Sequence, residues 1–213
     1  MDDNTLAKRS DIHLVRRLWH VLCGVICLFC YHLFDLEILY WGFIALAISL
    51  VGFVLDFSRF KNPDLNETLA VFFGPIMRTS EKLSFSGLPF YALGAALSIF
   101  MYQEDIAILS ILFLVFADPM ASVFGVTFGK DKLLPNKTLQ GTVAAFITCF
   151  VIAISYCFIK GIESPNIIMF AFLGAVFGAL SELLSAFNID DNLTIPVVSG
   201  AVLSVLNHVF VVF

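Results

Sequence analysis

The sequence predicts an all-α polytopic membrane protein of about seven transmembrane helices with a cytoplasmic N-terminus. Of the 213 residues, 60% are apolar, and the mean hydropathy is +0.95. Several continuous apolar runs approach or exceed the roughly 20 residues that cross a bilayer. The distribution of basic residues gives the orientation, as described below. We expect a single membrane-embedded domain over residues 1–213.

Polar segments separate the first three apolar runs. Residues 1–15 are polar and are expected to be cytoplasmic. The first apolar run follows this polar stretch and lacks a small-residue cleavage site, so we expect no cleavable signal peptide. Asp35 and Glu37 turn the chain after the first run, and Asp56 ends the second. Residues 69–77 then form an apolar stretch that is too short to cross and contains a Gly-Pro pair. An interfacial or re-entrant helix is expected there.

The later runs contain two prolines and one basic loop. Pro119 lies inside the fourth run and should kink its helix. Residues 130–140 carry lysines and are expected to form a loop, whereas Pro196 suits the first turn of the last helix. The seven expected spans are residues 18–34, 38–55, 84–101, 106–128, 142–159, 167–184 and 195–213.

Basic residues gather on one side of these spans. Eleven of the twelve lie on the side of the N-terminus, and only Lys160 lies on the other. The positive-inside rule therefore places the N-terminus, the 130–140 loop and the 190–194 loop in the cytoplasm. Any chemistry is expected on this face, where nucleotides are found. We expect no nucleic-acid partner.

The five cysteines all fall in expected spans, so a disulfide framework is not expected. Cys23, Cys27 and Cys30 share a helical face with His20. One helix cannot supply a tetrahedral metal site, so packing of small side chains is the simpler interpretation.

Residues 117–141 contain the highest concentration of chemically useful side chains. Asp118 interrupts an apolar run, and Ser122, Gly125 and Gly129 follow it on the same helical face. A carboxylate midway along a spanning helix costs roughly 2.5–3.5 kcal/mol on insertion scales and usually faces a polar cavity. We predict that Asp118 organises a metal or phosphate site. An ion pair with a lysine or arginine is the structural alternative.

Small and basic residues follow this face. An aspartate carboxylate, glycine backbone without side chains and lysine ammonium groups together suit the binding of a metal-bound polyphosphate. Neither a Walker P-loop nor a Rossmann glycine pattern is present. Gly-x-x-x-Gly is also a common packing motif, and Gly174 and Gly178 repeat it for internal packing or a possible homodimer. The predicted nucleotide-binding residues of the stretch are Gly125, Gly129, Lys130, Lys137, Thr138, Gln140 and Gly141.

Two more charged groups lie on the same predicted side. Arg78 and Lys82 are predicted to contact the nucleotide, and Glu81 is a candidate catalytic carboxylate. A surface pair between Arg78 and Glu81 is the alternative. The other group consists of acids. They could bind Mg²⁺ together with Asp118, or some of them could simply cap the last helix. Its members are Glu182, Asp190 and Asp191.

The base that accepts a substrate proton is not assigned by the sequence. His20, at the inner mouth of the first span, is a candidate together with Glu81 and Asp191. A lone histidine is more often structural.

Taken together, these motifs resemble the dolichol kinase/phytol kinase family of CTP-dependent polyprenol kinases. That family also includes the CTP-using diacylglycerol kinase of yeast type. The resemblance covers about residues 16–205 and departs at Gln140, where the family usually has Glu. The segments that carry it are Arg17-x-Trp19-His20, Arg78-x-x-Glu81-Lys82, the run from Asp118 to Gly141, and Asp190-Asp191-Asn192-Leu193-Thr194-Ile195-Pro196.

The resemblance implies Mg²⁺-dependent transfer of the terminal phosphoryl group of CTP to a lipid alcohol from the bilayer. The acceptor would be a polyprenol or dolichol, a phytol-type isoprenoid alcohol or diacylglycerol, and the products lipid phosphate and CDP. Phosphatidate cytidylyltransferases share the central motif, but their C-terminal signature is absent here. A membrane transporter is a third alternative, which the one-sided charge and the lack of an inverted repeat disfavour.

Overall fold

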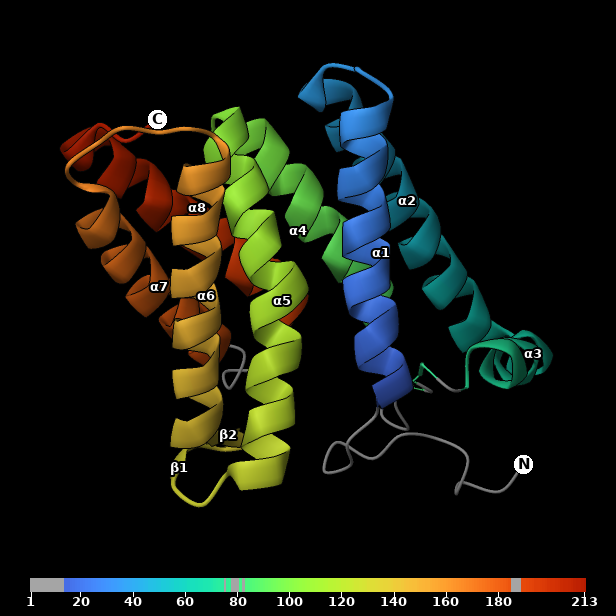
Figure 1. Ribbon diagram of the computed structural model, residues 1–213. Coiled ribbons are helices and arrows are strands. Elements are labelled where there is room, and N and C mark those ends of the chain that lie inside the picture. Colours follow the sequence, from blue (N-terminus) through green and yellow to red (C-terminus); the bar gives the residue numbers. More distant parts are fainter. Residues whose placement is uncertain (1–13, 75, 78–80, 82, 185–188) are drawn as a thin grey trace.

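The chain folds into a bundle of apolar helices with one small β-hairpin (Figure 1). The computed structural model describes residues 14–74, 76–77, 81, 83–184 and 189–213. The predicted nucleotide-binding residues Arg78 and Lys82 lie outside these residues. The helices are α1 (Leu14–Leu33), α2 (Ile38–Lys61), α3 (Pro63–Phe73), α4 (Gly87–Met101), α5 (Glu104–Phe128), α6 (Leu139–Ile159), α7 (Ile167–Leu183) and α8 (Asp191–Phe210). The strands are β1 (Lys132–Leu134) and β2 (Lys137–Thr138).

This architecture confirms the predicted all-α, polytopic membrane class. Five helices, α1, α2, α5, α6 and α8, are long and apolar enough to cross a membrane. Helices α4 and α7 are also apolar but contain 15 and 17 residues. These seven correspond to the seven expected spans, and α3, with 11 residues, overlaps the expected interfacial segment.

The segment expected to be a loop, residues 130–140, is more ordered than predicted. β1 and β2 pair antiparallel, with Lys132 opposite Thr138. The Thr138 side chain accepts a hydrogen bond from the Gly141 backbone N–H and caps α6, which therefore begins at Leu139 and not at residue 142. Hydropathy alone missed this start because the first turn of α6 is polar.

The last helix also begins earlier than predicted. Asp190 caps it by accepting the Asn192 backbone N–H at 3.0 Å, so α8 starts at Asp191. Pro196 consequently lies inside the helix, and its predicted place in the first turn is wrong. Proline removes a helical N–H, which leaves the Asn192 carbonyl without its usual intrahelical donor. Pro119 likewise lies within α5, which continues through it.

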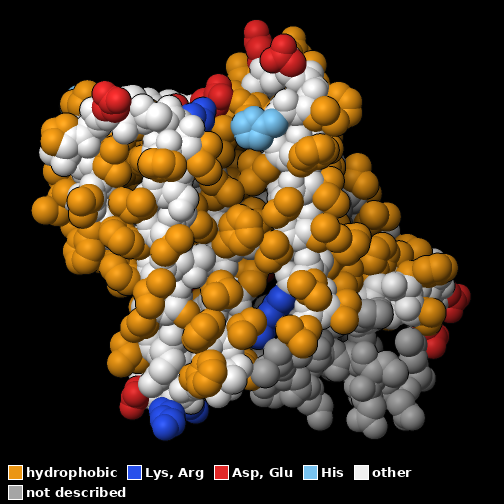
Figure 2. All heavy atoms as spheres, viewed as in Figure 1, with side chains coloured by type: hydrophobic (Ala, Val, Ile, Leu, Met, Phe, Trp, Pro, Cys, Tyr) orange, Lys and Arg blue, Asp and Glu red, His pale blue; other side chains and the backbone are white. Residues whose placement is uncertain are grey.

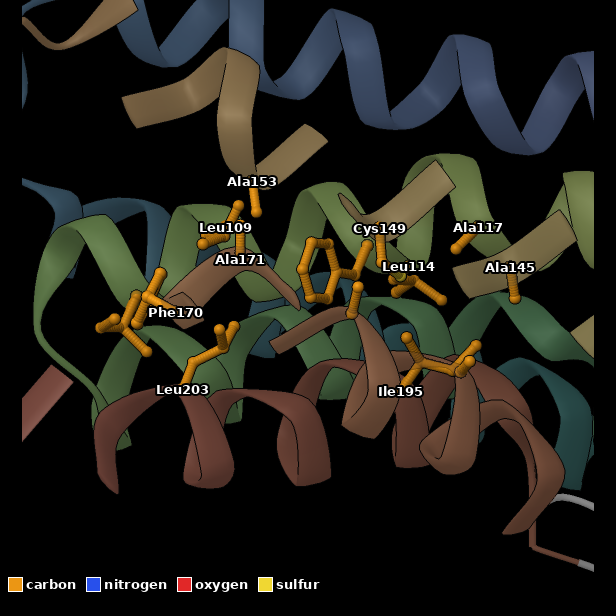
Figure 3. Packing of buried hydrophobic residues seen from close by; sticks show 14 of the residues in the cluster. Leu109, Leu114, Ala117, Ala145, Cys149, Ala153, Phe170, Ala171, Ile195 and Leu203 are labelled. Atoms are coloured by element: carbon orange, nitrogen blue, oxygen red, sulfur yellow. The ribbon is translucent and has the colours of Figure 1, made fainter. Parts of the chain in front are cut away.

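Helix α5 forms the centre of the bundle and packs against α6, α8, α1 and α4. In α5, 61% of the apolar window is buried, against 6% in α1, so α1 is peripheral. The core contains Leu109 and Phe113 of α5, with Cys149, Phe170 and Leu203 from the surrounding helices (Figure 3). All five cysteines, each within the described residues, are free thiols in α1 or α6.

The Gly174–Gly178 face serves internal packing. An ideal Cβ on Gly174 would lie 2.8 Å from Leu203, and one on Gly178 would lie 2.9 Å from Cys149 Sγ. Both glycines are buried. Of the two alternatives for this face, the structure therefore supports packing within the chain.

Helices α1 and α2 join the bundle through different helices. They meet at their upper turn and diverge toward the lower end, where α3 lies (Figure 1). α2 packs on α4, whereas α1 packs on α5. The β-hairpin and the N-terminal end of α1 also lie at the lower end, and the C-terminus lies at the upper end. Apolar side chains cover most of the visible surface between these ends, as expected beside lipid (Figure 2).

The contact between α4 and α8 gives a test of this packing. An ideal Cβ on Gly94 would lie only 2.3 Å from the Asn192 carbonyl oxygen and 2.8 Å from Pro196 Cγ. We expect Gly94→Ala to lower the thermal unfolding temperature of the purified protein, because overpacking costs about 1–3 kcal/mol. The intrinsic helix propensity of alanine acts in the opposite direction.

Gly52→Ala is the matched control, since its Cβ would come no closer than 3.2 Å to a neighbouring atom, Pro89 Cγ. Its unfolding temperature should stay near that of the wild type. Equal melting of the two variants would contradict the close approach of α4 and α8.

Candidate active site

Asp118 lies on α5 between two hydrogen bonds from α1. Arg17 Nη2 donates to Ser122 Oγ at 2.8 Å. His20 Nε2 lies 3.1 Å from the Leu114 carbonyl oxygen. Leu114 and Ser122 are each one helical turn from Asp118. Helix α1 therefore forms hydrogen bonds to α5 one turn before and one turn after Asp118.

Three of the predicted acids converge with one lysine. Lys137, on β2, forms an ion pair with Glu182 at the end of α7. Its Nζ also lies 3.9 Å from Asp191 Oδ2 at the start of α8. Asp118 and Asp191 both lie close enough to Glu182 to act on it electrostatically. The structure thus brings together four predicted site residues from four different helices and strands. They are Asp118 of α5, Lys137 of β2, Glu182 of α7 and Asp191 of α8.

The hairpin is fastened to α5 by Gln140. Gln140 Oε1 accepts the backbone N–H groups of Lys130 and Asp131, at 3.1 and 3.4 Å. Its Nε2 donates to Asp131 Oδ2 at 2.8 Å. Gln140 therefore makes its hydrogen bonds within the chain, and these fix the loop that carries Lys130. The predicted contact of Gln140 with the nucleotide stays a prediction. The Lys130 side chain is exposed.

The predicted glycines bring α5 and α6 into close contact. An ideal Cβ on Gly141 would lie 2.7 Å from the Ala121 carbonyl oxygen. One on Gly129 would lie 2.7 Å from Thr138 Cγ2, and one on Gly125 would lie 3.1 Å from Thr138 Oγ1. The close approach positions β2, and with it Lys137. Direct contact of these glycines and Thr138 with a nucleotide stays a prediction.

Asp190 has the capping role that the sequence left as the alternative for this acid. Its Oδ1 accepts both the backbone N–H and the side-chain Nδ2 of Asn192, at 3.0 and 2.7 Å. Its predicted metal contact stays a prediction. Asp191, the next residue, is the one that reaches Lys137.

A cavity of about 230 Å³ lies beside this charged cluster. It is bounded by α1, α2, α3, α4, the chain between α3 and α4, and the start of α8. Most of its lining side chains are apolar. The lining residues are Arg16, Trp19, His20, Cys23, Gly52, Leu55, Asp56, Arg59, Leu69, Phe73, Ile76, Met77, Glu81, Ser86, Gly87, Leu88, Tyr91 and Asn192.

A bidentate ion pair forms part of the cavity lining. Arg16 Nη1 and Nη2 donate to the two Glu81 carboxylate oxygens at 3.0 and 2.8 Å, and Nη1 also donates to the Ile76 carbonyl at 2.8 Å. Arg16 further lies within electrostatic range of Asp118 and Asp191. It therefore joins the cavity to the charged cluster. The sequence interpretation missed Arg16 as a site residue, although the Arg16–Arg17 pair beside Trp19-His20 was a signal.

A second buried ion pair supports the cavity wall. Arg59 Nε donates to Asp56 Oδ1 at 2.7 Å, and the other Asp56 oxygen accepts the Ser86 backbone N–H at 2.7 Å. Arg59 Nη2 donates to the Ser84 carbonyl at 2.7 Å. This network attaches the chain before α4 to α2. It was missed because Asp56 was taken as the end of a span, whereas α2 continues to Lys61.

The donor set fits the magnesium ion that the family resemblance implies. Mg²⁺ prefers oxygen ligands and is usually held by one or two carboxylates together with substrate phosphates and waters. Asp118 and Asp191 could supply these carboxylates, with Glu182 nearby. Within the described parts of the chain, no three His, Cys, Asp or Glu side chains are grouped so that they could hold a metal ion by themselves. Phosphate oxygens would have to complete the coordination.

The contacts of Gln140 lead to a specific prediction. Gln140→Glu would replace the hydrogen bond to Asp131 by repulsion between two carboxylates. Exposed charge pairs contribute up to about 1 kcal/mol, so we expect the KM for CTP to rise by at most ~5-fold. Adding Asp131→Asn should restore it, because the new amide can donate to Glu. A double variant that binds CTP no better than the single variant would contradict this role.

Comparisons with known proteins identify the family of this chain. The model of the "Cytidylyltransferase family" matches residues 6–184. The "CTP-dependent diacylglycerol kinase 1" of Saccharomyces cerevisiae is 33% identical over 92% of this chain and 73% of that protein. Its Schizosaccharomyces pombe namesake is 32% identical over 72% of this chain and 77% of that protein.

A plant protein is more distantly similar. "Probable phytol kinase 3, chloroplastic" of Glycine max is 27% identical over 94% of this chain and 66% of that protein. No solved structure matches. The family model covers residues 6–184, and the Saccharomyces cerevisiae relative covers 92% of the chain. The chain therefore belongs to the cytidylyltransferase family and, within it, to the CTP-dependent lipid kinases.

Proposed function

We propose that the protein transfers the terminal phosphoryl group of CTP to the hydroxyl of a membrane lipid alcohol, with diacylglycerol as the first acceptor to test. The observation that carries this proposal is the Arg16–Glu81 pair, which lies between an apolar cavity and a cluster of acids with a lysine. A lipid hydroxyl and a polyphosphate would meet at this point.

The charged cluster supports a phosphate-binding role. Phosphoryl transfer depends mainly on positioning and on stabilising charge at the phosphate oxygens. Lys137 is placed for this by the hairpin and by its ion pair with Glu182. Asp118 and Asp191 would hold Mg²⁺, which when bound neutralises phosphate charge. Arg16 and Lys130 are among the other described cations near this end of the bundle.

The cavity supports a lipid acceptor. Its apolar walls suit hydrocarbon chains, and Arg16, Glu81 and Asn192 supply polar contacts at one end. An ideal Cβ on Gly87 would lie 3.1 Å from both Arg16 Nη2 and Asn192 Nδ2, so α1 and α8 converge there. Several hydrogen-bonding groups suit a glycerolipid, whose ester carbonyls add to its hydroxyl. An isoprenoid alcohol, with one polar group, is the other acceptor class.

The distribution of charge supports a cytoplasmic active face. The lysine-bearing hairpin, α3 and the N-terminal end of α1 all lie at one end of the bundle (Figure 1). Eleven of the twelve basic residues belong to segments expected at this end. CTP would therefore reach the cluster from the cytoplasm.

Product analysis tests the proposed reaction. Purified protein in lipid nanodiscs is incubated with CTP, Mg²⁺ and either diacylglycerol, phytol or a polyprenol. We expect CDP and a lipid phosphate. Pyrophosphate together with a CDP-lipid from added phosphatidate would instead identify a cytidylyltransferase, and intact CTP with movement of a solute would favour a transporter.

The role of Asp118 gives a second test. Asp118→Asn removes a charge that can hold a metal but keeps the size of the side chain, so activity should fall by roughly 10²-fold or more. The variant should still insert and melt like the wild type. Asp105→Asn, at the opposite end of α5, is the matched control and should keep its activity. Full activity of Asp118→Asn would contradict the metal-site assignment.

A further inference from the structure

His20 has a defined hydrogen-bond arrangement at the cavity wall. Its Nε2 lies 3.1 Å from the Leu114 carbonyl oxygen. A carbonyl oxygen only accepts hydrogen bonds, so Nε2 must carry the hydrogen. In the neutral ring, Nδ1 then has a lone pair and no hydrogen. The contact with α5 thus selects one tautomer.

The remaining nitrogen of this ring is available to a ligand. Among the described residues, Nδ1 makes no hydrogen bond, and it is not one of the fully buried side-chain atoms that lack a partner, so it is not fully buried. The ring packs edge-on against Tyr91, with centroids 4.6 Å apart, which limits its rotation. His20 and Tyr91 both line the cavity. A fixed, accessible acceptor nitrogen therefore lies beside the space assigned to the lipid alcohol.

The carboxylates near the cavity are less suited to take a proton. Both Glu81 oxygens accept hydrogen bonds from Arg16. Asp56 accepts from Arg59 and Ser86. Asp191 lies in the cluster with Lys137 and is assigned to the phosphate side. The charged or titratable groups on the elements around His20 are Arg16, Arg17 and Cys23 on α1, Asp56 and Arg59 on α2, Glu81, Tyr91 on α4, Asp118 on α5 and Asp191 on α8.

We propose that His20 Nδ1 is the general base that accepts the proton of the lipid hydroxyl, an inference that rests on the proposed kinase function. The hydroxyl oxygen attacks the terminal phosphorus of CTP and forms the new P–O bond. The bond from that phosphorus to the bridging oxygen breaks, and its electron pair leaves with CDP. The hydroxyl proton moves to Nδ1, giving an imidazolium that later releases it to water. The Leu114 contact keeps the required tautomer through the reaction.

His20→Gln separates this chemical role from a structural one. The glutamine amide can still donate to the Leu114 carbonyl, but it cannot act as a base. With CTP and dioctanoylglycerol as substrates, we expect kcat to fall roughly 10²- to 10⁴-fold. The KM for CTP and the unfolding temperature should not change. His32→Gln, an exposed histidine at the outer end of α1, is the matched control and should match the wild type.

The pH profile supplies a second readout. The wild-type kcat should fall toward acid pH, because a general base must be unprotonated to act, and His20→Gln should lose this dependence. If His20→Gln keeps the kcat of the wild type, the assignment is overturned. The role of His20 would then be its hydrogen bond to the Leu114 carbonyl of α5. If His20→Gln melts early, His20→Ala with added imidazole decides the question: restored turnover supports the base, and no restoration in folded protein overturns it. An inactive wild type would instead refute the proposed kinase function itself.

Discussion

The structure depends on a carboxylate placed midway along a spanning helix. Asp118 lies on α5, the most buried of the five long apolar helices, where an isolated charge would be strongly unfavourable. Helix α1 is poorly buried, yet it supplies hydrogen bonds to α5 one turn before and one turn after this residue. The peripheral helix is therefore fixed by polar contacts more than by apolar packing. Those contacts hold the helix that carries Arg16, whose guanidinium lies within electrostatic range of Asp118.

Arg16 connects the two halves of the proposed site. It binds both oxygens of Glu81 at the end of the cavity and also lies within electrostatic range of Asp118 and Asp191. A buried pair of this kind is expected to hold a defined geometry, because breaking it leaves an uncompensated charge. The lipid side and the phosphate side of the site thus share one guanidinium. This arrangement explains why α1, which contributes little to the core, carries several residues of the site.

The sequence predicted those structural features that depend on one continuous segment of the chain. Apolar runs predicted seven of the helices, and the motif from Asp118 to Gly141 predicted the lysine that meets Glu182 and Asp191. Pairs between distant segments could not be predicted: Arg16 lies 65 residues from Glu81, and nothing local to either residue specifies the other. Helix starts were also missed, because Thr138 and Asp190 cap helices whose first turns are polar. The hydrogen bonds of Gln140 likewise needed the position of Asp131, which only the hairpin defines.

Photochemical labelling of the acceptor site tests the central claim most directly. A diacylglycerol that carries a diazirine near its glycerol end is irradiated with the protein in nanodiscs, and the labelled peptides are identified by mass spectrometry. The structure predicts labels on the cavity lining, at Trp19, Cys23 and Leu88, which unlabelled diacylglycerol should suppress. Competed labelling confined to the lipid-facing surfaces of α6 and α7, with none on the cavity lining, would contradict the placement of the lipid alcohol beside Arg16 and Glu81.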